Sequence, residues 1–265
     1  MRVAVLGSGS SGNAVVVTSG EHRLLIDAGF SCRQLEGRLR CVGEDPAQLE
    51  ALLLTHEHTD HVRGAMRLAR RHSVPISATS GTLRAASLVA DRLAFEERPP
   101  LPESHVVRSG RPFEVPGFQV EAFAVPHDAA EPVGYVVEDE GGRRLGLAAD
   151  LGCRSQLAWG RLRDLDCLIL ETNHDLGMLR SGPYPWHLKQ RVAGRHGHLS
   201  NEEAAAGLPE LLGERLRTVV LYHLSRTNNL PALAVETLGE QLDRERATLD
   251  LMVSDQHQST AWIEL

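Results

Sequence analysis

The sequence predicts an α/β protein in which two β-sheets pack face to face with helices on the outside. Two observations predict this class. Strand patterns fall into two groups, one in each half of the 265-residue chain, and each group has helical patterns of its own. The composition, 42% apolar and 24% charged, supplies a large core. The length and the lack of a low-complexity linker favour a single domain over residues 1–265.

The first half begins with a strand at 2–6, followed by Gly7-Ser-Gly-Ser-Ser-Gly12. This segment matches the dinucleotide-binding pattern G-x-G-x-x-G, which requires a helix directly afterwards. A β-branched run at 14–18, a turn at Ser19-Gly20 and an apolar run at 23–27 predict a hairpin instead. The pattern of strand and hairpin therefore disfavours a nucleotide site of that kind.

The next elements alternate between helix and strand. Residues 31–50 are expected to be helical or irregular, and the nearly continuous apolar run at 49–55 predicts a strand covered on both faces. Residues 62–72 combine apolar positions at helical spacing with four arginines on another face, which predicts an amphipathic helix. Turns rich in Gly and Pro then separate short predicted strands at 74–78, 105–108, 118–125, 133–138 and 144–149.

The second half repeats the mixture of helices and strands. The helices are expected at 154–163, 185–195, 200–212 and 231–245. The strands are expected at 166–171, 218–222, 248–253 and 258–264.

Charge and targeting signals limit the classes of function. The net charge of −7 argues against a surface that is basic throughout, although residues 62–90 and 178–198 hold bases with no acid among them. No apolar run approaches the roughly 18 residues of a membrane span, and the apolar stretch at the start is too short for a signal peptide. A cytoplasmic protein is therefore expected. The four cysteines form no C-x-x-C pair, and we assign them no chemical role.

Three histidines and a carboxylate stand together directly after the strand predicted at 49–55. They are His56, His58, Asp60 and His61. Imidazole and carboxylate suit zinc, manganese or iron, and so tight a loop can present ligands to two adjacent ions but cannot saturate both. The further candidates each follow a predicted strand: His127, Asp150 and His223. One strand-end histidine alone is more often a hydrogen-bonded core residue, so the prediction depends on the repeated placement.

The motif order resembles the metallo-β-lactamase superfamily over residues 1 to about 225, with H-x-H-x-D-H after a strand and Leu-Ile-Asp27-Ala-Gly before it. More narrowly, motifs along almost the whole chain resemble the YycJ/WalJ group, a bacterial branch near RNase J and tRNase Z. These motifs are Gly9-Ser-Ser-Gly-Asn13, Glu171-Thr-Asn-His-Asp175, Tyr184-Pro-Trp186, Gly197-His-Leu-Ser-Asn201 and His223-Leu-Ser-x-x-Asn-Asn229. The resemblance implies a four-layer αββα sandwich with a dinuclear site at one edge and 5′-to-3′ exonuclease activity on DNA.

The resemblance also implies roles for individual residues. The ligands of the first ion would be His56, His58 and His127. Those of the second ion would be Asp60, His61 and His223, with Asp150 bridging the two. Asp27 would brace the ligand loop by hydrogen bonds rather than touch metal. The implied cofactors are two divalent ions, Mn²⁺ or Zn²⁺, whose identity depends on availability in the cell.

Further residues are candidates for contact with the substrate. His198 resembles the catalytic histidine of tRNase Z-like relatives and is the expected proton donor to the leaving group, beside Asp60 and His174 as candidate catalytic residues. Ser200 and Glu203 form an S-x-x-E pattern, which predicts a helix whose first amides face a phosphate. The alternative is an ordinary helix cap beside an exposed histidine.

The remaining candidates are Asn173, Arg180 and Lys189. Asn173 and His174 follow a predicted strand and are expected near the phosphate, although a stabilising turn is an equal alternative. Arg180 and Lys189, together with Tyr184 and Trp186, are expected to hold a strand terminus by charge and stacking. The alternative for this segment is a solvated linker with Trp186 in the core.

These observations favour a metal-dependent nuclease that acts on nucleic acid, most simply an exonuclease on DNA ends with a role in repair. RNA is an alternative substrate, no membrane partner is expected, and the sequence permits a monomer without fixing the oligomeric state. The competing hypotheses are a small-molecule phosphodiesterase or other hydrolase on the same scaffold, and a non-catalytic nucleic-acid-binding protein. Fold alone does not decide between them.

Overall fold

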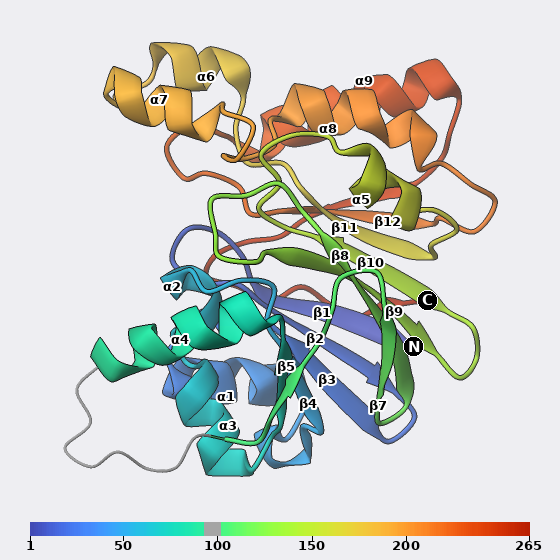
Figure 1. The fold of residues 1–265 in the computed structure, drawn as a ribbon. Helices are drawn as coiled ribbons and strands as arrows, with labels where there is room; N and C mark the ends of the chain where they lie inside the picture. Colours follow the sequence, from blue (N-terminus) through green and yellow to red (C-terminus); the bar gives the residue numbers. More distant parts are fainter. Residues whose placement is uncertain (93–101) are drawn as a thin grey trace.

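Two seven-stranded sheets stack face to face in the computed structural model, which describes residues 1–92 and 102–265 (Figure 1). The order of the first sheet is β14-β1-β2-β3-β4-β5-β6. Its strands are β1 (Arg2–Gly7), β2 (Ala14–Ser19), β3 (His22–Ile26), β4 (Ala51–Leu53), β5 (Ile76–Ala78), β6 (Ser104–Val106) and β14 (Ile263–Glu264). The antiparallel β1, β2 and β3 continue into a parallel run from β3 to β6.

The second sheet has the order β13-β12-β11-β10-β9-β8-β7. Its strands are β7 (Pro112–Val115), β8 (Phe118–Ala124), β9 (Val133–Asp139), β10 (Arg144–Ala148), β11 (Cys167–Glu171), β12 (Thr218–Tyr222) and β13 (Asp250–Val253). The strands from β7 to β10 pair antiparallel, and those from β10 to β13 pair parallel. Parallel strands end at the same edge of a sheet, so the residues that follow β10, β11 and β12 are brought together.

Helices cover both outer faces of the sandwich (Figure 1). Those beside the first sheet are α1 (Cys32–Cys41), α2 (Thr59–Val62), α3 (Ala65–His72) and α4 (Ser80–Arg92). Those on the side of the second sheet are α5 (Gln156–Arg161), α6 (Leu176–Ser181), α7 (Trp186–Val192), α8 (Asn201–Gly207) and α9 (Pro231–Glu245). Short 3₁₀ helices occupy Pro46–Gln48 and Leu208–Glu210.

The core has three layers, which agree with this arrangement. The central layer draws buried residues from both sheets, such as Val5 and Leu53 from the first and Tyr135 and Ile169 from the second. A second layer packs α1 and α3 against the first sheet, and a third packs α5, α8 and α9 against the second. The predicted class of two stacked sheets with outer helices is therefore confirmed.

Several predicted boundaries differ from the structure. The helix expected over 62–72 is interrupted at residues 63 and 64, between α2 and α3, and glycine fits at position 64 because a Cβ there would lie 2.3 Å from the carbonyl oxygen of Phe30. The helices α4 and α6 and the strand β7 were not predicted. A six-residue helix such as α6 shows too little periodicity, and it begins because Asp175 accepts a hydrogen bond from the amide of Met178. Only the last part of the strand expected at 258–264 forms, as β14.

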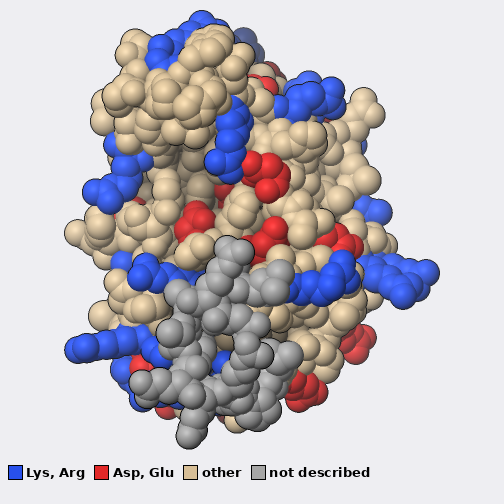
Figure 2. All heavy atoms as spheres, turned by 60° about the vertical axis from the view of Figure 1, so that its left-hand side comes forward, with Lys and Arg blue, Asp and Glu red and all other residues tan. Residues whose placement is uncertain are grey.

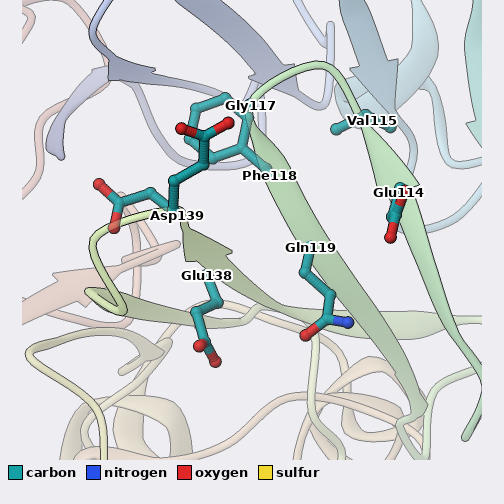
Figure 3. Close-up of a pocket in the computed structure, with 8 residues that line it drawn as sticks. Glu114, Val115, Gly117, Phe118, Gln119, Glu138 and Asp139 are labelled. Atoms are coloured by element: carbon teal, nitrogen blue, oxygen red, sulfur yellow. The ribbon is translucent and has the colours of Figure 1, made fainter.

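A cavity of about 440 Å³ lies between β7, β8 and β9, and Figure 3 shows the side chains that line it. Glu114, Glu138 and Glu140 make its lining acidic. It lies beside the start of β8 and the end of β9, whereas His127 follows the opposite end of β8. A cavity with this charge repels phosphate, so we assign it no part in binding nucleic acid. Within the described ranges no helix is both long and apolar enough to cross a membrane.

Candidate metal centre and substrate cavity

The candidate site lies at one edge of the sandwich, where several strands end. Asp27 follows β3, Asp150 lies just beyond β10, and His223 follows β12. The backbone of each is left-handed, with φ of 59°, 52° and 60°. Residues other than glycine rarely adopt this conformation, and it is found where the surrounding structure holds a functional side chain in place. The backbone is therefore strained at three of the site residues predicted from the sequence.

Asp27 supports the loop that carries His56, His58, Asp60 and His61. Its carboxylate accepts hydrogen bonds from the amide and hydroxyl of Thr55, each at 2.8 Å, and lies 2.7 Å from Nδ1 of His61. Gly29 lets the loop pass close by, because a Cβ at this position would lie 1.7 Å from the carbonyl oxygen of Asp60. These contacts place Asp27 beneath the cluster rather than inside it.

The structure brings the seven sequence-predicted ligand residues together. Ligand atoms within 4.8 Å of one another form three relevant groups: His56 with His58 and His127; Asp60 with His61 and His223; and His56 with His61 and Asp150. The closest approaches are 3.2 Å between Nε2 of His127 and Nδ1 of His58, and 2.8 Å between Nε2 of His61 and Oδ2 of Asp150. Asp150 thus lies between the two groups of histidines.

The buried ring nitrogen of His56 fits a cation. Nε2 of His56 has no hydrogen-bond partner among the described residues, and Oδ2 of Asp150 lies 3.8 Å from it. The other ring nitrogen of His56 lies 3.0 Å from the hydroxyl of Thr55, and Nδ1 of His127 lies 3.0 Å from the carbonyl oxygen of Gly197. Partners of this kind fix the ring and leave one nitrogen directed at an ion.

The protonation states suit metal binding as well. Burial lowers the pKa of His56 and of His127, which favours the neutral imidazole that a metal requires. Burial acts to raise the pKa of Asp150, but His223 and His61 outweigh it and hold that pKa well below its usual range. His56 and His127 therefore offer neutral nitrogens and Asp150 an ionised carboxylate, a donor set typical of zinc or manganese. Burial acts to lower the pKa of His61 and of His223 as well, but the nearby carboxylates outweigh it and raise both.

Glu171 and His198 form a pair beside the cluster. Glu171, the last residue of β11, is fully buried and accepts hydrogen bonds from the amides of Leu151 and Leu199. Its other oxygen lies 2.7 Å from Nδ1 of His198, which is also 3.1 Å from Asp150. Burial opposes charge on His198, but Glu171 and Asp150 raise its pKa well above the usual value. The ring is therefore held in place as a cation.

Glu171 was not among the sequence-predicted site residues. The signal that could have found it is the same one that predicted Asp150 and His223, a functional side chain at the end of a strand in the second sheet. It was overlooked because a glutamate inside the strand pattern reads as part of the strand itself.

A cavity of about 440 Å³ opens over the cluster. Its lining on the cluster side includes His58, Asp60, Asp150, His198 and His223. Asn173 also lines it and donates a hydrogen bond from Nδ2 to the carbonyl oxygen of His223 at 2.8 Å. The segment that contains α7 adds Tyr184, Leu188, Arg191 and Val192 to the lining. On the face that Figure 2 shows, Lys and Arg side chains surround a central group of acids.

The structure does not place Ser200 or His174 at this cavity. Ser200 is fully buried, and its hydroxyl accepts a hydrogen bond from the amide of Glu203, so α8 begins where the sequence predicts. The amide of Asn201 donates to the carbonyl oxygen of His174 at 2.9 Å. Two of the first amides of α8 are therefore bonded within the protein, and the phosphate site at the start of this helix stays a prediction. His174 is itself 1% exposed, with neither ring nitrogen hydrogen-bonded to a described residue.

The predicted pair of bases, Arg180 and Lys189, also lies away from the cavity lining. Nζ of Lys189 donates to the carbonyl oxygen of Arg180 at 2.6 Å, so this lysine ties α7 to the end of α6. Arg191 takes the position at the cavity instead and pairs with Asp128 at 2.7 Å. Residues 189 and 191 point to different sides of α7 because of the helical period, so only one of them can face the cavity.

His174 predicts how stability depends on pH. Burial lowers its pKa from 6.5 to about 4, so the unfolded chain takes up the proton first as the pH falls. Stability due to the neutral ring is full above pH 6.5 and is lost between pH 6.5 and pH 4, by about 3 kcal/mol. We expect His174→Leu to remove this part of the acid sensitivity. Thermal melts of both proteins across this range test it, and parallel curves would contradict it.

Two stacked sheets with a histidine and carboxylate cluster at one edge define a protein of the metallo-β-lactamase fold. Solved structures agree with this class. The Zn²⁺-bound PqqB of Methylobacterium extorquens superposes with a TM-score of 0.72 at 22% identity and covers 100% of both chains. The metallo-β-lactamase fold protein YhfI of Bacillus subtilis gives a TM-score of 0.70 at 17% identity over 98% of both chains.

The family follows from the sequence comparison. The model of the beta-lactamase superfamily domain matches residues 22–224. The exodeoxyribonuclease WalJ of Streptococcus pneumoniae strain D39 is 34% identical over 91% of this chain and 88% of its own length. The exodeoxyribonuclease YycJ of Bacillus anthracis is 32% identical over 92% of this chain and 90% of its own. The chain belongs to the beta-lactamase superfamily, and the resemblance to the YycJ/WalJ group is confirmed.

Proposed function

We propose that this protein is a metal-dependent phosphodiesterase of nucleic acid, acting as a 5′-to-3′ exonuclease on DNA ends. The observation that carries the proposal is a seven-residue ligand cluster that opens into a cavity beside the cationic His198. The two relatives named as exodeoxyribonucleases share at least 32% identity over about nine-tenths of the chain, which supports the same substrate class here. A role in DNA repair follows from an activity on ends.

Two divalent ions, Mn²⁺ or Zn²⁺, are the proposed cofactors. His56, His58 and His127 would hold one ion, Asp60, His61 and His223 the other, and Asp150 would contact both. Ions bound there would neutralise phosphate charge and lower the pKa of a water molecule toward neutrality. The buried, unpaired Nε2 of His56 supports this assignment, since an uncompensated buried polar atom is otherwise costly.

The chain's own residues supply the remaining requirements for cleaving a phosphodiester. His198 faces the cavity with its Nε2 edge free while Glu171 and Asp150 hold Nδ1, so it is placed to give a proton to a departing oxygen. Glu171 orients this ring and keeps it charged. Arg191 also lines the cavity, where it pairs with Asp128.

The proposal is tested by cleavage of a 5′-labelled linear DNA duplex with metal-stripped protein that is resupplied with Mn²⁺. We expect short labelled products only with metal, and none from Asp60→Ala. The matched control is Asp243→Ala, which removes an exposed aspartate of α9 far from the cluster along the chain. Hydrolysis of bis(p-nitrophenyl) phosphate without cleavage of DNA or RNA would show a small-molecule phosphodiesterase and contradict the nuclease assignment.

We further infer that residues 1–265 form one domain. The central core layer, which joins β1 near the start of the chain to β12 and β14 near its end, supports this inference.

A further inference from the structure

The cavity over the ligand cluster has a side that the chemistry of phosphate cleavage does not use. Tyr184, Leu188 and Val192 line it and are not among the metal ligands, and we call these three residues the apolar wall. Phosphate, sugar and metal are all polar, so an apolar wall is not required by the reaction itself. Its presence points to a ligand with a flat apolar part.

The helical period of α7 determines which side chains form this wall. Leu188, Arg191 and Val192 recur at the spacing of one helical face, and all three line the cavity. Trp186 lies two residues before Leu188, roughly 200° around the helix, and its side chain is 71% exposed. The two aromatic residues of this segment are therefore separated, with Tyr184 at the cavity and Trp186 on the outer surface.

The size and the charge of the cavity limit the ligand. At about 440 Å³ it falls within the range of roughly 300–1,000 Å³ that holds one small molecule, which suits one nucleotide rather than a base pair. Arg191, on the same helical face as the wall, pairs with Asp128, which lines the same cavity, so the charge of a phosphate is left to be balanced at the ligand cluster. A nucleotide combines the required parts, because its base can stack on an aromatic ring while its phosphate reaches the ligand cluster.

We propose that the apolar wall binds the base of the terminal nucleotide, with Tyr184 stacking on it, while the adjoining phosphodiester lies at the ligand cluster. This inference rests on the proposed nuclease function and adds the way in which the substrate end is recognised. The terminal base must leave its partner strand to enter the cavity. The enzyme would therefore release mononucleotides one at a time and favour ends that open easily.

The test compares ligands with and without a base. Deoxyadenosine monophosphate and 2-deoxyribose 5-phosphate share the sugar and the phosphate, so the ratio of their dissociation constants reports the contribution of the base. For the Mn²⁺-loaded wild type, calorimetry is expected to show deoxyadenosine monophosphate binding about tenfold more tightly. Tyr184→Ala and Tyr184→Leu are expected to lose most of this ratio, whereas Tyr184→Phe keeps it.

Trp186→Ala provides the matched control, because it removes an aromatic side chain two residues away on the outer face of α7. It is expected to keep the wild-type ratio. Equal binding of the two ligands by the wild type, or an unchanged ratio in both Tyr184→Ala and Tyr184→Leu, would contradict the proposal that the apolar wall binds the base. Loss of the ratio in Trp186→Ala to the same extent would overturn it too.

Cleavage assays on the same proteins separate this proposal from the proposed function. If the wild type degrades DNA and substitution of Tyr184 leaves the ratio of dissociation constants unchanged, the nuclease assignment holds and base binding by the apolar wall is wrong. If the wild type does not cleave DNA but substitution of Tyr184 abolishes the ratio, the nuclease assignment is wrong and a nucleotide-binding site is supported. Product length adds a second readout, since longer oligonucleotide products from the wild type would contradict a cavity that takes one nucleotide.

Discussion

Replacing Asp150 with asparagine is expected to lower DNA cleavage by about 10³-fold, the upper end of what loss of one electrostatic contact to a transition state costs. Asp150 is 2% exposed and lies 2.8 Å from His61 and 3.8 Å from His56, so it is placed between the two proposed ion sites. Asparagine keeps the size of the side chain but removes the charge that balances two cations. Steady-state kinetics and metal analysis of the purified protein measure the two effects together.

Asp128→Asn is the matched control for this substitution. Oδ1 of Asp128 lies 3.4 Å from Nε2 of His127, but the side chain is 34% exposed and pairs with Arg191. We expect its loss to change cleavage only a few-fold, since an exposed ion pair contributes little. Wild-type rates and two bound ions in Asp150→Asn would show that this carboxylate does not bridge the centre.

Replacing His198 with alanine is expected to lower turnover of DNA by about 10² to 10⁴-fold, the range for loss of general acid catalysis. His198 lies in a group of possible ligands with Asp150, Glu171 and His223, but we expect the metal content to stay at the wild-type level, because Nδ1 of His198 is already bonded to Glu171. Its fixed orientation between Glu171 and Asp150 makes it the best-placed proton donor at the cavity.

The leaving group tests this role directly. A p-nitrophenolate departs without a proton, whereas a sugar alkoxide needs one, so His198→Ala should lose far less activity on bis(p-nitrophenyl) phosphate than on DNA. Glu171→Gln, which keeps the shape but removes the charge that supports the imidazolium, should show the same pattern with a smaller loss. Equal losses on both substrates would instead indicate that His198 supports the structure of the site.

The ligand set could be predicted from the sequence because each member follows a strand. His127, Asp150 and His223 come from distant parts of the chain, yet parallel and stacked strands carry their ends to one edge. The left-handed backbone at Asp150 and His223 was not predictable, because it depends on the neighbours that hold the loops. Glu171 also lies at the end of a strand, but it was not predicted because it is the last residue of β11 rather than a residue that follows the strand.

The substrate contacts were harder to predict than the ligands. A basic segment indicated that residues 178–198 approach phosphate, but it could not show that Lys189 bonds to the end of α6 while Arg191 reaches the cavity. The same limit applies to the start of α8, where the amide of Asn201 is already bonded to His174. Such contacts depend on which helix lies beside which loop.

By itself the sequence determined the class of fold, most of the strands and helices, the superfamily and the seven side chains of the candidate metal centre. The elements and the candidate ligands follow from local periodicity and from residue types at strand ends, and the superfamily follows from the resemblance of its motifs, all of which short stretches of chain contain. Only the tertiary structure decided the pairing of β14 with β1, the position of Glu171 under His198, and the division of Tyr184 from Trp186. These depend on packing between residues far apart in the chain, because an element's own pattern shows which face is apolar but not what that face meets.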